Sequence, residues 1–267
     1  METLANKIVK SVRFPFELHI DITNHCNMKC SVCPMAARYT EPIMPLGYMD
    51  FELYKNIIDQ CHAHHWTGYE INLHKDGEPL MHDRIGDMIQ YAKSKGAFVH
   101  FATNGLLLMK RKDDLINSGL DLLTVSLTEE WQTRELAKFM EYRGKYGPFT
   151  QAKLYNEYRL FEIPDVDRVF FSNLHNFTNP GAERRAPCRK LLYNPAITWD
   201  GEFVLCCVDY KREGVVGNVK EDTIENLWNK VRQVYFDQCM TYFTSPCDKC
   251  TYCETLKMEE TKCHLEL

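Results

Sequence analysis

Short apolar stretches with strand-like residues recur along the first two-thirds of the chain. Segments whose apolar residues have helical spacing separate several of them, and this alternation is typical of a parallel sheet or barrel. Helices are predicted over Asp50–Cys61, Asp83–Lys95 and Lys110–Ser118, the last two stopped by glycines. Strands are predicted over Glu17–Ile22, Tyr69–Leu73, Ala97–Ala102, Leu122–Leu127, Thr150–Tyr155 and Arg168–Ser172.

This pattern predicts an α/β fold, specifically a partial (β/α)6 TIM-like barrel. The final strand stretches are short, which favours a barrel that is not fully closed. Polar loops follow the predicted strands in order: a cysteine loop, Asp76–Pro79, Thr103–Gly105, and Ser126 at the end of the fourth strand. Because active sites of parallel barrels lie at the carboxyl ends of the strands, we expect these loops to share one site.

The last third of the chain has a different pattern. Ala196–Trp199 and Glu202–Cys206 predict a hairpin around the turn dipeptide Asp200-Gly201. We therefore expect two domains, a barrel over residues 1–180 and a smaller extension over residues 181–267.

Composition narrows the possible partners. The chain of 267 residues has a net charge of −5, with 26% charged and 12% aromatic residues, which is typical of a folded soluble protein. This charge gives no reason to expect nucleic acid or an anionic membrane as a partner. The amino-terminal segment lacks the apolar core of a signal peptide, and no apolar run is long enough to span a bilayer. We expect a cytoplasmic protein.

Cysteine is the unusual component, with twelve residues in the chain. In a reducing compartment, closely spaced thiols more often hold metal or take part in chemistry than form disulfides. One group lies near the start of the chain and the other lies in the last third: Cys26, Cys30 and Cys33, then Cys188, Cys206, Cys207, Cys247, Cys250 and Cys253.

The first group has the spacing C-x3-C-x2-C over Cys26, Cys30 and Cys33. Three ligands on one short loop leave a tetrahedral metal or a cubane cluster one ligand short, so one position stays open. A closed zinc site would need a fourth ligand, and His25 is available for it.

These thiols resemble the defining C-x3-C-x-Φ-C loop of the radical S-adenosylmethionine (SAM) superfamily. Asp76-Gly77-Glu78-Pro79 looks like the GGE motif of that family, and Thr103-Asn104-Gly105 follows in the correct order. The resemblance covers roughly residues 15 to 175. Asp76 stands in place of the first glycine of GGE, and Val32 stands where an aromatic residue is common.

The resemblance implies that three thiolates bind a 4Fe-4S cluster and that SAM chelates its fourth iron. Electron transfer then cleaves SAM, and a 5′-deoxyadenosyl radical takes a hydrogen atom from the substrate. Gly77 and Glu78 are assigned to the methionyl group, and Asn104 and Ser126 to the ribose. An electron donor such as flavodoxin or ferredoxin is also implied.

The second group resembles the SPASM and shorter twitch extensions of the same superfamily. Their C-x9-15-G-x4-C pattern corresponds to Cys188, Gly201 and Cys206, and Ile224–Asn229 looks like their I-x-x-Φ-W-N segment. Spacing alone allows zinc or iron–sulfur, whereas the resemblance implies one auxiliary 4Fe-4S cluster. Its expected ligands are Cys188, Cys206, Cys247 and Cys250, with Cys253 as an alternative to Cys250.

In length, in its GEP motif and in Ser172-Asn173, the chain resembles radical dehydrogenases of aminocyclitol antibiotic pathways. That resemblance implies oxidation of a carbinol carbon of a sugar or aminocyclitol to a ketone, with Glu157 and His175 as candidate general bases. The alternatives are epimerisation with a cysteine hydrogen donor, modification of a ribosomal peptide, and a non-catalytic metal-cluster protein. Polar residues expected near the substrate are His74, Lys75, Glu129, Glu130, Asn176 and Arg184.

Overall fold

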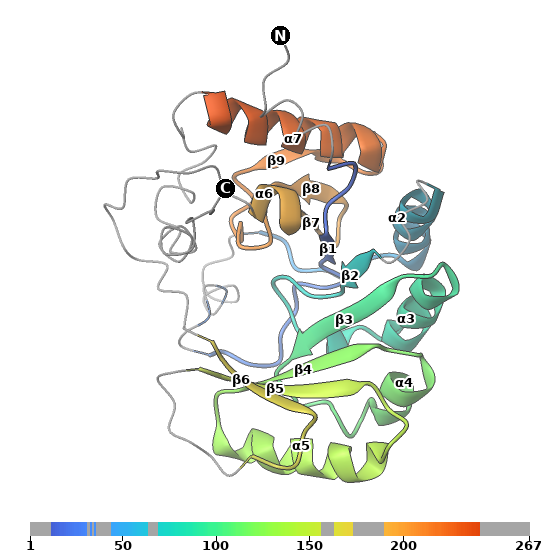
Figure 1. Cartoon of the computed structure of the whole chain (residues 1–267), viewed down its shortest axis with the longest axis vertical. Helices are drawn as coiled ribbons and strands as arrows, with labels where there is room; N and C mark the ends of the chain where they lie inside the picture. Colours follow the sequence, from blue (N-terminus) through green and yellow to red (C-terminus); the bar gives the residue numbers. More distant parts are fainter. Residues whose placement is uncertain are drawn as a thin grey trace, which may run out of the picture.

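A computed structural model describes residues 12–30, 33, 35, 44–63, 69–155, 163–172 and 190–240. Its strands form one sheet in the order β6-β5-β4-β3-β2-β1-β7-β8-β9 (Figure 1). The strands are β1 (Glu17–Ile20), β2 (Glu70–Asn72), β3 (Phe98–Thr103), β4 (Leu122–Leu127), β5 (Phe149–Tyr155), β6 (Arg168–Ser172), β7 (Ala196–Ile197), β8 (Glu202–Val204) and β9 (Val215–Asn218).

The strands from β1 to β6 are parallel, and β6 does not pair with β1, so the sheet is open. This confirms the predicted partial barrel. β7 joins the free side of β1 in parallel, with His19 opposite Ala196, and β8 and β9 continue the sheet as antiparallel strands. The carboxyl-terminal strands therefore extend the sheet of the barrel, and the hairpin predicted around Asp200-Gly201 is confirmed.

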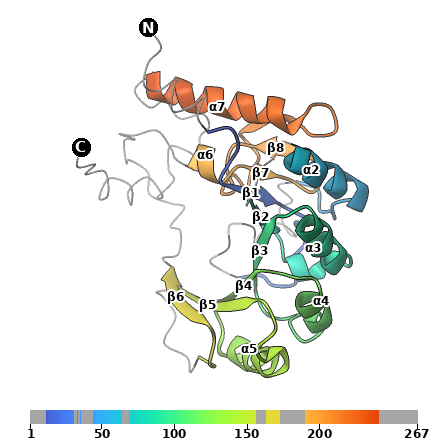
Figure 2. The same ribbon diagram turned by 45° about the vertical axis from the view of Figure 1, so that its right-hand side comes forward.

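Helices cover one face of this sheet. α2 to α5 line that face in chain order, and α7 packs against β9, α6 and α2 (Figures 1 and 2). The helical elements are α2 (Phe51–Ala63), η2 (Pro79–Met81), α3 (Ile85–Ser94), α4 (Lys112–Asn117), α5 (Glu130–Arg143), α6 (Lys190–Tyr193) and α7 (Ile224–Met240).

The two faces of the sheet differ in chemistry. Strand side chains alternate between the two faces of a sheet. Val99, Phe101 and Leu123 lie on the face that the helices cover, and all three are completely buried. On the opposite face, the register places Thr124 beside Gln151 and Ser126 beside Lys153. Towards the carboxyl ends of β4 and β5, the face away from the helices is therefore polar.

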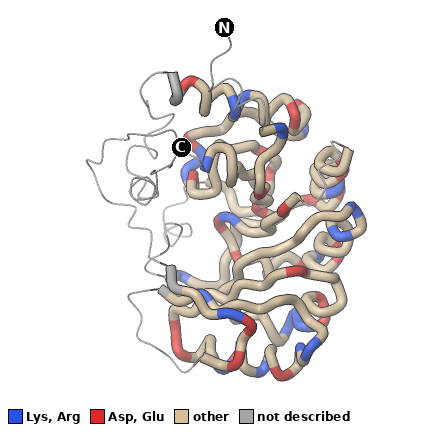
Figure 3. Tube along the Cα trace, in the orientation of Figure 1, with Lys and Arg blue, Asp and Glu red and all other residues tan. Residues whose placement is uncertain are grey.

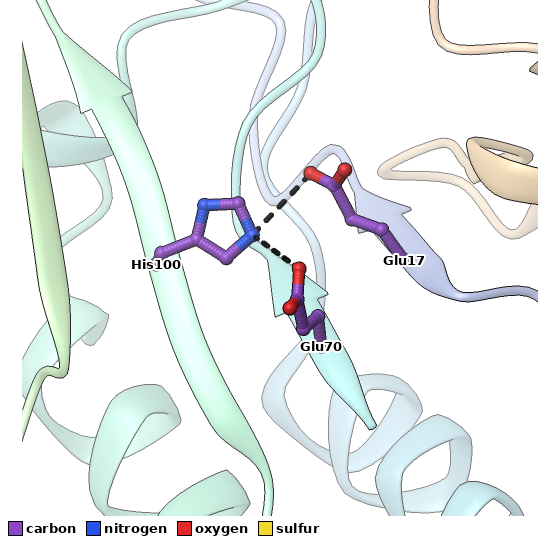
Figure 4. A group of neighbouring side chains, drawn as sticks. All are labelled: Glu17, Glu70 and His100. Carbon is purple, nitrogen blue, oxygen red and sulfur yellow. Dashed lines mark ion pairs between the residues drawn. The ribbon is translucent and has the colours of Figure 1, made fainter. Parts of the chain in front are cut away.

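Glu17, Glu70 and His100 meet near the amino-terminal ends of the first strands (Figure 4). The Nε2 atom of His100 lies 3.3 Å from Oε1 of Glu17 and 4.0 Å from Oε2 of Glu70. Glu17 also accepts hydrogen bonds from the side chains of Asn72 and Asn194, at 2.7 Å and 2.6 Å. Burial opposes ionisation of Glu17, but these donors and neighbouring histidines hold its pKa far below the usual range. Glu17 thus joins β1, β2 and β3 to the segment before β7, at the end of the barrel associated with stability.

Candidate active site

The first cysteine group lies on the loop that leaves the carboxyl end of β1. Cys26, Cys30 and Cys33 are all partly exposed. The amide of Cys33 donates to the carbonyl oxygen of Cys30 at 3.0 Å. Burial and the nearby Cys33 thiol raise the pKa of Cys30. The loop therefore presents three accessible thiols within one short turn, as the spacing predicted.

The base of this loop is fastened to a returning segment. Thr23 donates its hydroxyl to the carbonyl oxygen of Gly47 at 2.8 Å. The side-chain amide of Asn24 donates to Pro45 at 2.9 Å, and the amide of Gly47 donates back to Asn24 at 2.8 Å. A Cβ atom on Gly47 would lie 2.4 Å from the ring of Trp199, so this position requires glycine. These contacts fix the direction in which the cysteine loop leaves the sheet.

The thiols fit an iron–sulfur cluster better than zinc. His25, the possible fourth zinc ligand, stacks on Tyr48 with ring centroids 4.5 Å apart. Tetrahedral zinc with Zn–S bonds of about 2.3 Å would hold its sulfurs about 3.8 Å apart. Within the part of the chain that the structure describes, the three thiols do not form a group whose ligand atoms all lie within 4.8 Å. A cubane, in which each thiolate binds a different iron, suits the wider spacing.

The loop after β2 lies directly on the cysteine loop. A Cβ atom on Gly77 would lie 2.0 Å from the carbonyl oxygen of Thr23 and 2.7 Å from that of His25. The amide of Glu78 donates to His25 at 2.7 Å. Gly77 is therefore required for close approach of two backbones, and it brings the GEP segment to the thiols.

Glu78 is 2% exposed and its carboxylate is already engaged by the protein. One oxygen accepts from the hydroxyl of Thr103 at 2.7 Å and from the amide of Leu80 at 3.1 Å. The other accepts from the amide of Asn104 at 2.8 Å. Burial raises the pKa of Glu78 to about 7 in spite of these three donors. A carboxylate has roughly four acceptor positions, so these three donors leave about one of them.

Asn104 points its side chain at the cysteine loop. Its Nδ2 atom donates to Oδ1 of Asn27 at 2.8 Å and lies 3.8 Å from Sγ of Cys26. Its Oδ1 atom accepts from the amide of Leu106 at 3.0 Å. This amide therefore donates towards Cys26, an expected cluster ligand, a contact that the predicted ribose role did not include.

Ser126 lies at the end of β4 on the polar face, as predicted, and a buried glutamine holds its backbone. Gln132 donates to the carbonyl oxygens of Asn104 at 2.6 Å and Ser126 at 2.9 Å. Its Oε1 atom accepts from the amides of Thr128 and Glu129, both at 2.6 Å. Sequence reasoning missed Gln132, although Glu129-x-x-Gln132 has the spacing of a capping box.

Cys206 lies two residues after the end of β8 and is buried, and Cys207 beside it is partly exposed. The amide of Cys207 donates to the carbonyl oxygen of Asn194 at 2.8 Å, which places the pair next to β7. The other expected ligands and both candidate bases lie outside the described residues: Cys188, Cys247, Cys250, Glu157 and His175. The ligand set of the second cluster stays a prediction.

Two family models match separate parts of the chain. Residues 20–148 match the radical SAM superfamily, and residues 188–254 match SPASM, an iron–sulfur cluster-binding domain. The second match spans Cys188, Cys206, Cys247 and Cys250.

Curated relatives align along nearly the whole chain. The tungsten-containing aldehyde ferredoxin oxidoreductase cofactor-modifying protein of Pyrococcus furiosus is 23% identical, covering 92% of this chain and 91% of the relative. The S-adenosyl-L-methionine-dependent 2-deoxy-scyllo-inosamine dehydrogenase of Niallia circulans is 22% identical, covering 91% of this chain and 94% of the relative. The crystal structure of BtrN in complex with AdoMet and 2-DOIA shares the fold, with a TM-score of 0.67 at 19% identity over 90% of this chain and 93% of that one.

Proposed function

Because this chain belongs to the radical SAM superfamily and carries a SPASM iron–sulfur domain, we propose that it oxidises a carbinol carbon of a sugar or aminocyclitol to a ketone. The observation that carries the proposal is the similarity to 2-deoxy-scyllo-inosamine dehydrogenase, which extends over 91% of this chain and 94% of that enzyme. The two domains imply a SAM-binding 4Fe-4S cluster, an auxiliary cluster and SAM as cofactors.

The chain would hold the first cluster through Cys26, Cys30 and Cys33. When bound, cluster and SAM supply a 5′-deoxyadenosyl radical that can remove a hydrogen atom. In the proposed arrangement, the remaining acceptor position of Glu78 binds the methionyl amine, close to Gly77. Asn104 and Ser126 stand at the carboxyl ends of β3 and β4, the rim that reaches the thiols, and remain the proposed ribose contacts.

Oxidation of an alcohol carbon removes one hydrogen atom, one proton and one electron. The hydrogen atom leaves with 5′-deoxyadenosine. We assign the proton to Glu157 or His175, which follow late strands in the chain. We assign the electron to an auxiliary 4Fe-4S cluster with Cys188, Cys206, Cys247 and Cys250 as its proposed ligands.

The polar face of the sheet supports a substrate rich in hydroxyl or amino groups. Thr124, Ser126, Gln151 and Lys153 lie there on adjacent strands. Gln151 donates to the hydroxyl of Thr124 at 2.8 Å, so donors and acceptors on this face are already oriented. Hydroxyl and amino groups of a substrate can pair with these side chains, whereas an apolar substrate cannot.

The remaining assignments are parts of the same proposal. The enzyme is proposed to be cytoplasmic, with one domain over residues 1–180 and a second over residues 181–267. Flavodoxin or ferredoxin is the proposed electron donor, and neither nucleic acid nor a membrane is a proposed partner. Basic and acidic residues are interspersed over the described chain (Figure 3). In that part of the chain, no helix combines the length and apolar character needed to cross a bilayer.

The test uses anaerobically reconstituted, reduced protein with candidate polyols and amino sugars in heavy water. The proposal predicts a product that is lighter than the substrate by two hydrogen atoms, together with 5′-deoxyadenosine. A product of inverted configuration carrying a solvent deuteron on carbon would overturn it in favour of epimerisation. Turnover of a peptide, with no polyol or amino sugar changed, would overturn the proposed substrate class.

A further inference from the structure

Charged side chains lie buried between the GEP loop and the loop that follows Cys206. The side chains of Lys75 and Asp76 are 0% and 4% exposed. Asp21 at the end of β1 and Asp209 after β8 are also buried. Lys75 was expected to contact substrate from the rim, but its amine is enclosed by protein.

Lys75 connects two segments that are far apart in the sequence. Its Nζ atom forms an ion pair with Asp76 and donates to the carbonyl oxygen of Asp209 at 3.0 Å. The carboxylate of Asp209 accepts from the amides of Glu213 at 3.1 Å and Gly214 at 2.8 Å, which closes the loop after β8. The Lys75 amine therefore links the end of β2 to a loop that is itself well ordered by hydrogen bonds.

Asp76 is held from the other side by β1. Its amide donates to Oδ1 of Asp21 at 3.1 Å, while Oδ2 of Asp21 is buried without a hydrogen-bond partner among the described residues. Burial and the charge of Asp76 raise the pKa of Asp21 to about 7. The charge of Lys75 acts in the opposite direction on this pKa, so Asp21 lies close enough to Lys75 to serve as a second counter-ion.

The contacts continue on both sides of this ion pair. Towards the first cysteine group, Gly77 and Glu78 lie against the backbone of His25. Towards the second group, the amide of Asp209 donates to the carbonyl oxygen of Cys206 at 3.1 Å. An unbroken series of contacts thus runs from the loop of Cys26 to Cys206 through Lys75.

We propose that Lys75 is a positioning residue that fixes the SAM-binding loop relative to the loop carrying the auxiliary-cluster ligand Cys206. Asp76 occupies a position where the superfamily motif has glycine, because a fully buried lysine needs a counter-ion. The inference rests on the proposed role of Cys206. It assigns to Lys75 the task of keeping the substrate site at a constant distance from the electron acceptor.

Three variants separate positioning from simple charge compensation. Asp76→Gly keeps the contact between Lys75 and Asp209, and Asp21 then remains as the counter-ion of Lys75. Lys75→Met leaves buried carboxylates uncompensated, and we expect it to lose thermal stability. The double variant Lys75→Met/Asp76→Gly removes both charges and keeps the fold, but it loses the link. Lys93→Met, which removes a partly exposed ion pair with Asp121, is the control.

The readout is amide hydrogen exchange of residues 205–214 in the holoenzyme, compared with core strands. We expect amides of this loop to exchange at least tenfold faster in the double variant than in wild type. The core strands of the double variant should keep wild-type rates, and so should this loop in Asp76→Gly and in Lys93→Met. Equal exchange in the double variant and Asp76→Gly would overturn the proposal, because Lys75 would then only balance charge. If Lys75→Met does not fold, this comparison still decides.

The consequence for turnover is measured separately. We expect the double variant to form several-fold more 5′-deoxyadenosine per oxidised product than Asp76→Gly. An unchanged ratio would overturn the positioning role. If wild-type protein forms no ketone from any substrate, the proposed function fails, while the exchange experiment still tests the link.

Discussion

Glu78 shows how one residue can serve both cofactor and fold. The GEP motif assigns it to the methionyl group, whereas the structure shows its carboxylate holding Thr103, Leu80 and Asn104. A short motif can identify such a residue but not its hydrogen-bond partners. Leu80 is a local partner in η2, whereas Thr103 and Asn104, at the end of β3, meet Glu78 only after the sheet has formed.

Glu78 makes stability depend on pH. Burial raises its pKa from 4.5 to about 7, so the folded protein binds the extra proton in this range. The contribution of Glu78 to the free energy of unfolding is complete below pH 4.5 and declines as the pH rises to about 7. With about 1.4 kcal/mol for each pKa unit, the loss is about 3 kcal/mol. In urea unfolding of the apoprotein, wild type should lose more stability between pH 5 and pH 8 than Glu78→Gln loses. Equal losses in the two proteins would contradict this role of Glu78.

The contact between Asn104 and Cys26 predicts that replacing Asn104 changes the reduction potential of the first cluster. Its side-chain amide lies 3.8 Å from Sγ of Cys26, and hydrogen bonds to cluster sulfurs raise the reduction potential. Losing one bond worth about 0.5–1.5 kcal/mol corresponds to roughly 20–60 mV for one electron. Asn104→Leu should lower the midpoint potential of the first cluster by that amount in an EPR-monitored titration. Asn117→Leu, at an exposed position of α4, is the control, and identical potentials in wild type and both variants would refute the contact.

Whole elements were predicted unevenly. The bounds predicted for β4 and β6 match the structure, because each is a short, mostly apolar run that begins after an aspartate and ends before a threonine or an asparagine. α5 was missed because two of its four buried residues, Gln132 and Thr133, are polar, which weakens the apolar periodicity. β9 was missed because Val215–Asn218 is short and partly exposed.

Gln132 is the residue through which α5 acts on the site. Replacing it with alanine removes hydrogen bonds to four backbone groups at the ends of β3 and β4. Gln132→Ala should lower the free energy of unfolding by about 2–4 kcal/mol, because buried polar groups are left unpaired. Lys138→Ala, which breaks an exposed pair with Glu135 on the same helix, should cost about 0.5 kcal/mol or less. Comparable losses in chemical denaturation would contradict the assignment.

Replacing Gly77 tests the contact between the cysteine loop after β1 and the GEP loop after β2. Gly77→Ala would place a Cβ atom 2.0 Å from the carbonyl oxygen of Thr23. The loops must then separate, and we expect reconstituted protein to lose at least about half of the iron bound by the first cluster. Gly96→Ala is the control: the positive φ of Gly96 strains alanine, but its Cβ would have no neighbour within 4 Å, so this variant loses stability without pushing the two loops apart. Full iron content in Gly77→Ala would show that close approach is not required.

The molecule as a whole is one continuous open sheet, and this limits what sequence motifs can predict. Cysteine spacing predicts two regions of the chain, and the two family models match residues 20–148 and 188–254. The parallel pairing of β7 with β1 was not predicted, since β7 contains only Ala196–Ile197. The contact between Lys75 and Asp209 joins residues 134 positions apart, so no local pattern could reveal it.

The most direct test of the central claim is the formation of 5′-deoxyadenosine from SAM by anaerobically reconstituted, reduced protein. Wild type should form it, and the variant Cys26→Ala should not, because only two thiolates would remain for the first cluster. Tyr146→Phe, at a side chain that is 93% exposed, should behave as wild type. Fully loaded wild-type protein that leaves SAM intact would contradict catalysis and would favour a structural or redox-sensing metal-cluster protein.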